Sequence, residues 1–185
     1  MVRFRLFAAV LVGIQILSSA ALAQAGGDDG LKAFLDAYRC AMTDRLAYLH
    51  QLSPKETDRF IVVELADTPT SYAQCLFLKD NRTVFCEAAS GYYIEPVDTP
   101  RTKYLSAESK AVLKDLGFSM DDSKSNFRRT SRLPRNNSYD GFADLLLTIM
   151  YRVYGARMDT KLAVETPLLG EKDSPLLKAA CEPLS

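Results

Sequence analysis

Residues 59–88 constrain the fold of this chain more than any other stretch, because they hold three β-rich runs separated by turn-forming residues. The runs cover residues 59–66, 72–79 and 82–88, and Asp80 and Asn81 form the second turn. Folding the chain at this turn places Cys75 opposite Cys86 in an antiparallel hairpin. We therefore predict a three-stranded antiparallel meander. Because side chains alternate along a strand, the two cysteines are expected to share one face with Ala73, Phe77, Val84 and Ala88.

The four cysteines allow three pairings. A disulfide between Cys75 and Cys86 would staple the hairpin and leave Cys40 for Cys181, closing a loop of roughly 140 residues. Metal binding is the competing interpretation, but the cysteines lack C-x-x-C spacing and His50 is the only histidine. The sequence therefore predicts two disulfides, no metal site and no cofactor.

The N-terminus has the pattern of a secretory signal peptide. Arg3 and Arg5 precede the apolar run 6–17, and Ala21 and Ala23 form an A-x-A cleavage site before Gln24. The run is shorter than the ~20 residues that a membrane span needs. We expect cleavage after Ala23, no membrane span, and a periplasmic or secreted protein in which disulfides persist.

Helical patterns surround the meander. Residues 24–30 are small and polar and predict a flexible mature N-terminus, whereas residues 31–49 carry apolar side chains at helical spacing. Ser106 is expected to cap a second helix that runs to Leu116, with Gly117 and Phe118 forming a Schellman stop. The fold class is therefore α+β, with an antiparallel sheet packed against three helices.

The second half of the chain adds one or two further strands to the meander. Residues 126–133 alternate well enough for a fourth strand, and residues 161–165 are a candidate fifth. Asn137 or Ser138 is expected to cap a third helix over residues 139–154. After it, Ser174 and Pro175 are expected to begin a short helical turn that leads to Cys181.

The third predicted helix is apolar over more than one stripe of its surface. A helix of this kind is buried on more than one side, either inside one subunit or in a dimer interface. A homodimer is therefore one of the two arrangements that the sequence predicts. The apolar residues are Phe142, Leu145, Leu146, Leu147, Ile149, Met150 and Val153.

The order of elements resembles that of the type III secretion chaperone and YbjN-like superfamily. The resemblance is sharpest at the helix stop 113–118, the strand start 126–129 and the apolar helix 143–155. It covers residues 31–155 and implies a small, often dimeric α+β domain that binds extended polypeptide segments without catalysis. Residues 156–185 would then be a C-terminal extension tethered by its disulfide. The signal peptide and the disulfides exclude a cytosolic chaperone that hands effectors to an export machine.

Charge and motifs exclude several functions. With 23 basic and 23 acidic residues the chain lacks the basic surplus of a nucleic-acid binder. A Ser-His-Asp triad would require His50, which lies in the last turn of the first predicted helix, where capping or surface exposure is the expected role. No G-x-S-x-G, S-x-x-K or H-E-x-x-H motif is present. The sequence therefore predicts a protein that is not an enzyme.

Candidate binding residues lie on the fourth strand and after the meander. Lys124, Arg128, Arg129, Arg132 and Arg135 form a basic run without an acid. In a strand, Arg128 and Arg132 share one face and Arg129 takes the other. The run is either a charged guard on a strand edge or a binding strip for acidic segments, phosphate or lipid head groups. The neighbouring aromatic residues Tyr92 and Tyr93, which follow the third predicted strand, either lie at the edge of the core or form part of a ligand site.

These patterns favour an exported, non-enzymatic module that binds a protein or peptide partner along a sheet edge or groove. Two alternatives remain. One is a small exported hydrolase whose catalytic groups form no recognisable motif, and the other is a structural protein of the cell envelope.

Overall fold

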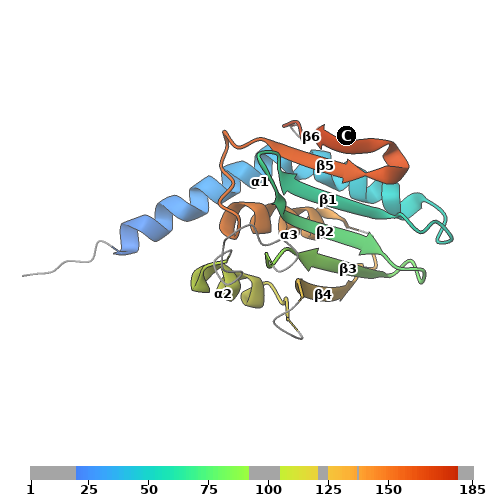
Figure 1. Cartoon of the computed structure of the whole chain (residues 1–185), viewed down its shortest axis with the longest axis horizontal. Coiled ribbons are helices and arrows are strands. Elements are labelled where there is room, and N and C mark those ends of the chain that lie inside the picture. Colours follow the sequence, from blue (N-terminus) through green and yellow to red (C-terminus); the bar gives the residue numbers. More distant parts are fainter. Residues whose placement is uncertain (1–19, 92–104, 121–124, 137, 179–185) are drawn as a thin grey trace, which may run out of the picture.

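The computed structural model describes residues 20–91, 105–120, 125–136 and 138–178 (Figure 1). Six strands form one antiparallel sheet in the order β4-β3-β2-β1-β5-β6, and the predicted α+β class is confirmed. The sequence predicted the three-stranded meander and one or two further strands, and the sheet has three further strands. The strands are β1 (Phe60–Leu65), β2 (Thr68–Phe77), β3 (Thr83–Ala88), β4 (Phe127–Arg132), β5 (Leu162–Thr166) and β6 (Glu171–Pro175).

The meander has the register that the cysteines predicted. Cys75 pairs with Cys86 across β2 and β3, and the two form a disulfide. Beyond the strands, the Leu78 amide donates to the Thr83 carbonyl at 2.9 Å. The Asp80 carboxylate accepts hydrogen bonds from the Thr83 hydroxyl and from the Arg82 and Thr83 amides, which lowers its pKa to about 2. These bonds fix the turn and therefore the register.

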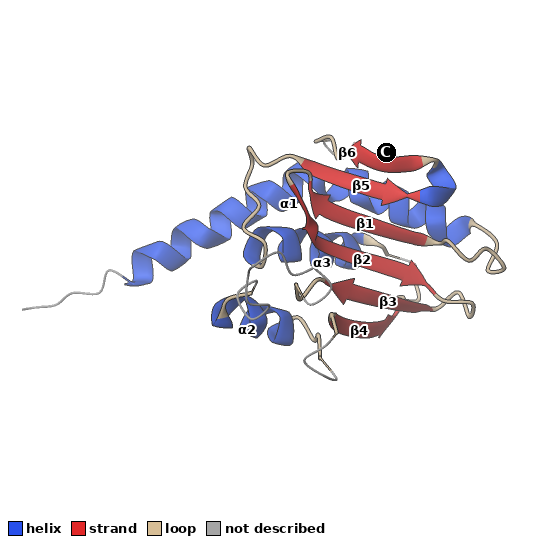
Figure 2. Cartoon of the chain, in the orientation of Figure 1, coloured by secondary structure: helices blue, strands red, loops and turns tan. Residues whose placement is uncertain are grey.

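Helices α1 (Ala20–Gln51) and α3 (Asp140–Arg152) cover one face of the sheet (Figures 1 and 2). The predicted stripe of the first helix supplies core residues at 0 to 3% exposure: Phe34, Tyr38, Met42, Leu46 and Leu49. None of the described helices is long and apolar enough to cross a membrane.

Helix α1 begins at Ala20, and residues 24–30 continue it instead of forming the predicted flexible segment. Extending a formed helix adds one hydrogen bond per residue without a new nucleation cost, so a polar run can continue a helix anchored by packing. Gly30 lies where α1 approaches α3, since a Cβ at this position would come within 2.4 Å of the Tyr151 hydroxyl oxygen. Cleavage after Ala23 remains a prediction.

Helix α2 (Ala107–Asp115) has the predicted caps. The Ser106 hydroxyl accepts a hydrogen bond from the Ser109 amide, and Gly117 adopts a φ of 80°. The amides of Gly117 and Phe118 donate to the carbonyls of Lys114 and Leu113, which is the Schellman pattern. The α3 cap differs, because Tyr139 occupies the N-cap position without a side-chain hydrogen bond. Ser138 is therefore not the cap, and Asn137 lies outside the described residues.

The apolar surface of α3 is buried within a single chain. All seven predicted apolar residues, Phe142 to Val153, are at most 7% exposed. Helix α3 packs against α1, α2, β1 and β2, so it is covered on several sides at once. The breadth of its apolar surface therefore does not require a dimer.

The chain after α3 returns to the sheet instead of forming a separate extension. Strand β5 confirms the candidate strand at 161–165 and pairs with β1, while Ser174 and Pro175 end β6 instead of beginning a helical turn. An edge strand tolerates a proline because its outward side needs no ladder hydrogen bond. Residues 162–175 thus belong to the same structural unit as residues 31–155.

A bidentate ion pair joins α1 to the far edge of the sheet. Arg45 donates to both carboxylate oxygens of Glu171 in β6, at 2.9 and 2.7 Å. Cys40 in the same helix is disulfide-bonded, and its predicted partner Cys181 lies outside the described residues.

Candidate binding surfaces

None of the helices that the structure describes lies on the face of the sheet opposite α1 and α3 (Figure 2). Neighbouring positions on β1, β2 and β3 form an apolar row on this open face, where Phe60 pairs with Leu76 and Leu76 with Phe85. All three side chains are half-buried, in contrast to the buried residues between them on the other face. An apolar row that remains partly exposed across three strands is a surface that a partner can cover.

A polar row runs parallel to the apolar row on the open face. Gln74 of β2 pairs with Glu87 of β3, and Glu87 pairs with Arg128 of β4, while the row ends on β1 at the apolar Val62. The Gln74 amide donates to Glu87 at 2.8 Å, and the Arg128 guanidinium lies 3.7 Å from the same carboxylate. The charge of Arg128 is thus partly balanced on the sheet itself.

The three predicted binding arginines do not lie together. Arg128 and Arg132 project to the open face with Thr130, as strand alternation predicted. Arg129 points to the other face, where it donates to the Leu116 carbonyl at 2.7 Å and to the Ser131 hydroxyl at 2.9 Å. Arg129 therefore holds the C-terminus of α2, and the basic strip is reduced to Arg128 and Arg132.

Strand β4 is an edge of the sheet, which is also the position that a charged guard would occupy. Ser119 forms a two-bond bridge with the outward-facing backbone of Arg128, at 2.8 and 2.7 Å. Among the remaining candidates, Arg135 is exposed after β4, whereas Lys124, Tyr92 and Tyr93 lie outside the described residues.

His50 neither caps a helix nor lies exposed on the surface. Its half-buried ring has Nε2 2.9 Å from the Asn81 carbonyl and Nδ1 2.8 Å from the Tyr139 hydroxyl. Because a carbonyl only accepts, Nε2 carries a proton and donates to the Asn81 carbonyl. Both nitrogens are engaged in holding the β2–β3 turn against α1 and α3, so His50 has a structural position.

A buried arginine, Arg59, lies beside His50 and was not predicted as a functional or structural residue. Arg59 has no exposed surface and donates to the carbonyls of Leu49 and His50 at 3.0 Å, as well as to the Asn81 side chain. Burial lowers its pKa. Arg59 thus satisfies the last carbonyls of α1, and its position directly before an apolar strand was the only available signal.

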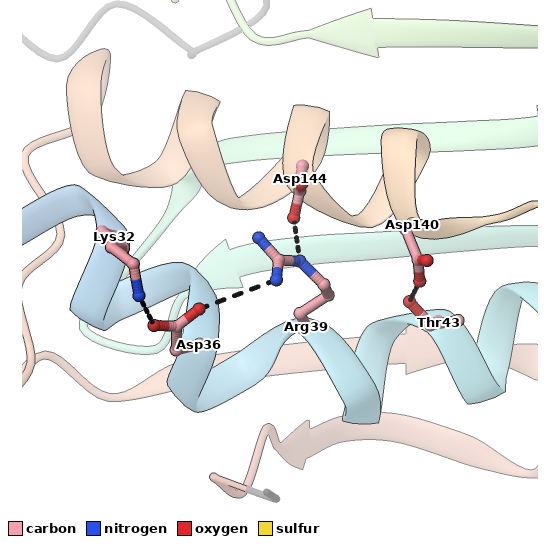
Figure 3. A network of polar contacts seen from close by, with 6 residues as sticks. All are labelled: Lys32, Asp36, Arg39, Thr43, Asp140 and Asp144. Atoms are coloured by element: carbon pink, nitrogen blue, oxygen red, sulfur yellow. Dashed lines mark hydrogen bonds and ion pairs between the residues drawn. The ribbon is translucent and has the colours of Figure 1, made fainter. Parts of the chain in front are cut away.

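The helical side of the molecule carries an ionic network between α1 and α3 (Figure 3). Arg39 lies 2.6 Å from Asp144 and 3.6 Å from Asp36, and Asp36 also binds Lys32 at 2.6 Å. The hydrogen bond from Lys32 is the largest cause of a lowered Asp36 pKa. These side chains are about one third to three quarters exposed, and the two cations face Asp36, Asp144 and the nearby Asp140, so the network joins two helices without presenting a surplus positive charge to a ligand.

A cavity of about 580 Å³ lies at the corner between α1, the start of β5 and the residues that follow β6. This corner cavity was not predicted, because its wall combines four separate parts of the chain. Its lining is Tyr38, Ala66, residues 158–163 and residues 175–178.

Among the residues that the structure describes, no group of histidine, cysteine, aspartate or glutamate side chains has the arrangement of a metal site. Comparison of the chain with family models, with curated proteins and with solved structures found no match.

Proposed function

We propose that the protein is a non-enzymatic binding module of the cell envelope that holds an extended polypeptide segment on the open face of its sheet. The observation that carries the proposal is the half-buried apolar row of Phe60, Leu76 and Phe85, on a face that no described helix covers. The signal-peptide pattern and the disulfide support an exported protein. The resemblance to secretion chaperones points to the same class of ligand.

The ligand that matches this face carries apolar side chains at every second position and acidic side chains of the same parity at one end. An extended segment presents every second side chain to the sheet, so apolar residues can cover the row at Phe85. Acidic residues at the end of the segment would meet Arg128 and Arg132 at the β4 edge. Arg132 is exposed and the nearby Arg128 shares its charge with Glu87, so Arg132 is the stronger attraction.

Selection from a library of random 12-residue peptides tests the proposal. We expect enrichment of sequences that carry apolar residues at every second position and continue the same alternation with aspartate or glutamate at one end. An enriched peptide, made synthetically, should bind Arg132→Glu about three- to tenfold more weakly, which is the scale of exposed charge contacts. Raised salt should weaken binding to the native protein, since added salt shortens the screening length below its value of about 8 to 10 Å at ordinary ionic strength.

Arg39→Glu is the matched control, because it reverses an arginine on the helical side of the molecule. This variant should bind the peptide as the native protein does. Failure to enrich any sequence, or equal loss of binding in both variants, would contradict a site on the open face.

A further inference from the structure

The corner cavity is separate from the open face and is built for a different ligand. Its wall is mainly apolar, with Tyr38 from α1, Leu162 and Ala163 from β5, and Leu176 after β6 all buried. At its mouth, Met158 is 40% exposed and Leu177 is 72% exposed. Exposed large apolar side chains around a cavity with a buried apolar wall are typical of a ligand site.

The rim of the corner cavity is positively charged. Lys161 and Lys178 lie in the lining with a single acid, Asp159. The Lys178 ammonium donates to the Met158 carbonyl at 2.8 Å and lies 5.9 Å from the centre of the Tyr38 ring. Lys161 is exposed and forms no ion pair with any residue that the structure describes. A cation of this kind beside an apolar cavity is complementary to an anionic head group.

We propose that the corner cavity binds a monomeric anionic amphiphile with one alkyl chain. The chain occupies the apolar interior lined by Tyr38, Leu162 and Leu176, and the head group lies at the rim beside Lys161. The volume of about 580 Å³ is within the range of roughly 300 to 1,000 Å³ typical of small-molecule sites. A cavity of this size encloses a single chain of moderate length, which distinguishes it from a surface that docks on a bilayer.

Titration calorimetry with sodium dodecanoate, below its micelle-forming concentration, tests the proposal. We expect saturable binding with one site per chain. Shortening the ligand to decanoate removes two methylenes and should weaken binding about fifteenfold, from about fourfold for each buried methylene. Dodecyltrimethylammonium, which has the same chain with a cationic head, should bind at least tenfold more weakly than dodecanoate.

Two variants separate the cavity from the remaining surface. Lys161→Glu should weaken dodecanoate binding about tenfold or more and should improve binding of dodecyltrimethylammonium. Lys172→Glu reverses an exposed lysine on β6 that does not line the cavity, so it should leave both affinities unchanged. Leu176→Trp, which enlarges a buried side chain of the lining, should abolish dodecanoate binding while circular dichroism confirms the fold.

Three outcomes would overturn the proposal. They are no saturable binding of dodecanoate, affinity that is independent of chain length, and binding to anionic phosphatidylglycerol vesicles without binding of monomeric dodecanoate. The peptide selected on the open face provides an independent measurement. Its binding should not change in Lys161→Glu, so failure of the cavity proposal leaves the proposed polypeptide-binding function testable by itself.

Discussion

Replacing Arg59 with methionine should destabilise the protein far more than the same change at Arg39, although Arg39 has more ionic partners. Arg59 is completely buried and donates to the carbonyls of Leu49 and His50 and to the Asn81 side chain. It forms no ion pair with the residues that the structure describes. Its contribution therefore comes from satisfying buried acceptors at the end of α1.

The magnitude follows from the acceptors that the change leaves behind. A buried acceptor without a partner costs about 1 to 3 kcal/mol, and Arg59→Met removes the donor from two carbonyls and one amide oxygen. Methionine recovers part of this cost because a charged group no longer has to be buried. We expect a net loss of about 2 to 4 kcal/mol. Arg39, which is 32% exposed on its side chain, should contribute about 0 to 1 kcal/mol through its pairs with Asp144 and Asp36.

Urea unfolding followed by far-ultraviolet circular dichroism measures both changes, with the disulfides left intact. With a slope of about 1 to 3 kcal/mol per molar urea, Arg59→Met should lower the midpoint by about 1 to 2 M. Arg39→Met should lower it by less than about 0.5 M. An equal or larger shift for Arg39→Met would refute the reasoning, since it would mean that ion pairs outweigh burial in this fold.

Two further predictions concern the sheet, namely the ion pair at its β6 edge and the disulfide between its inner strands β2 and β3. The hydrogen bonds from Arg45 lower the pKa of Glu171 below its ordinary value of 4.5, so this carboxylate stabilises the fold above that pH and the contribution is lost as the pH falls through the folded-state pKa. Urea unfolding at about pH 6 and about pH 3 should show that Glu171→Gln loses less stability on acidification than the native chain does, and an identical loss would contradict the pairing. Replacing Cys75 and Cys86 together with alanine should reduce the free energy of unfolding by about 3 kcal/mol, as the entropy model gives for a loop closed by residues 11 apart. A loss below about 1 kcal/mol would show that the strand pairs alone define the hairpin.

The sequence predicted the elements whose information is local. The register of β2 and β3 follows from Asp80 and the cysteine pair, because a short turn leaves the two strands only one alignment that buries both sulfurs. The caps of α2 were equally readable, since Ser106 and Gly117 act on backbone groups within a few residues of themselves.

Other features depended on which distant segments meet. Strand β5 pairs with β1, which lies about 100 residues earlier in the chain. Part of the predicted C-terminal extension therefore belongs to the sheet. Arg129 does not lie with the other arginines of the predicted binding strip, because its side chain donates to the Leu116 carbonyl at the C-terminus of α2. The face to which a strand residue points can be predicted from alternation along the sequence. The group that it contacts on that face depends on how distant segments pack.

The sequence by itself determined the class of the fold, the hairpin disulfide and the helical stripe that fills the core, because each follows from periodicity or from contacts between near neighbours. Only the tertiary structure decided that α3 is covered within one chain, that Arg59 closes the end of α1, and that residues 38, 66, 158–163 and 175–178 enclose a cavity. The physical reason is that a cavity or a buried donor needs several segments at fixed positions, and no single segment carries a pattern that records the others.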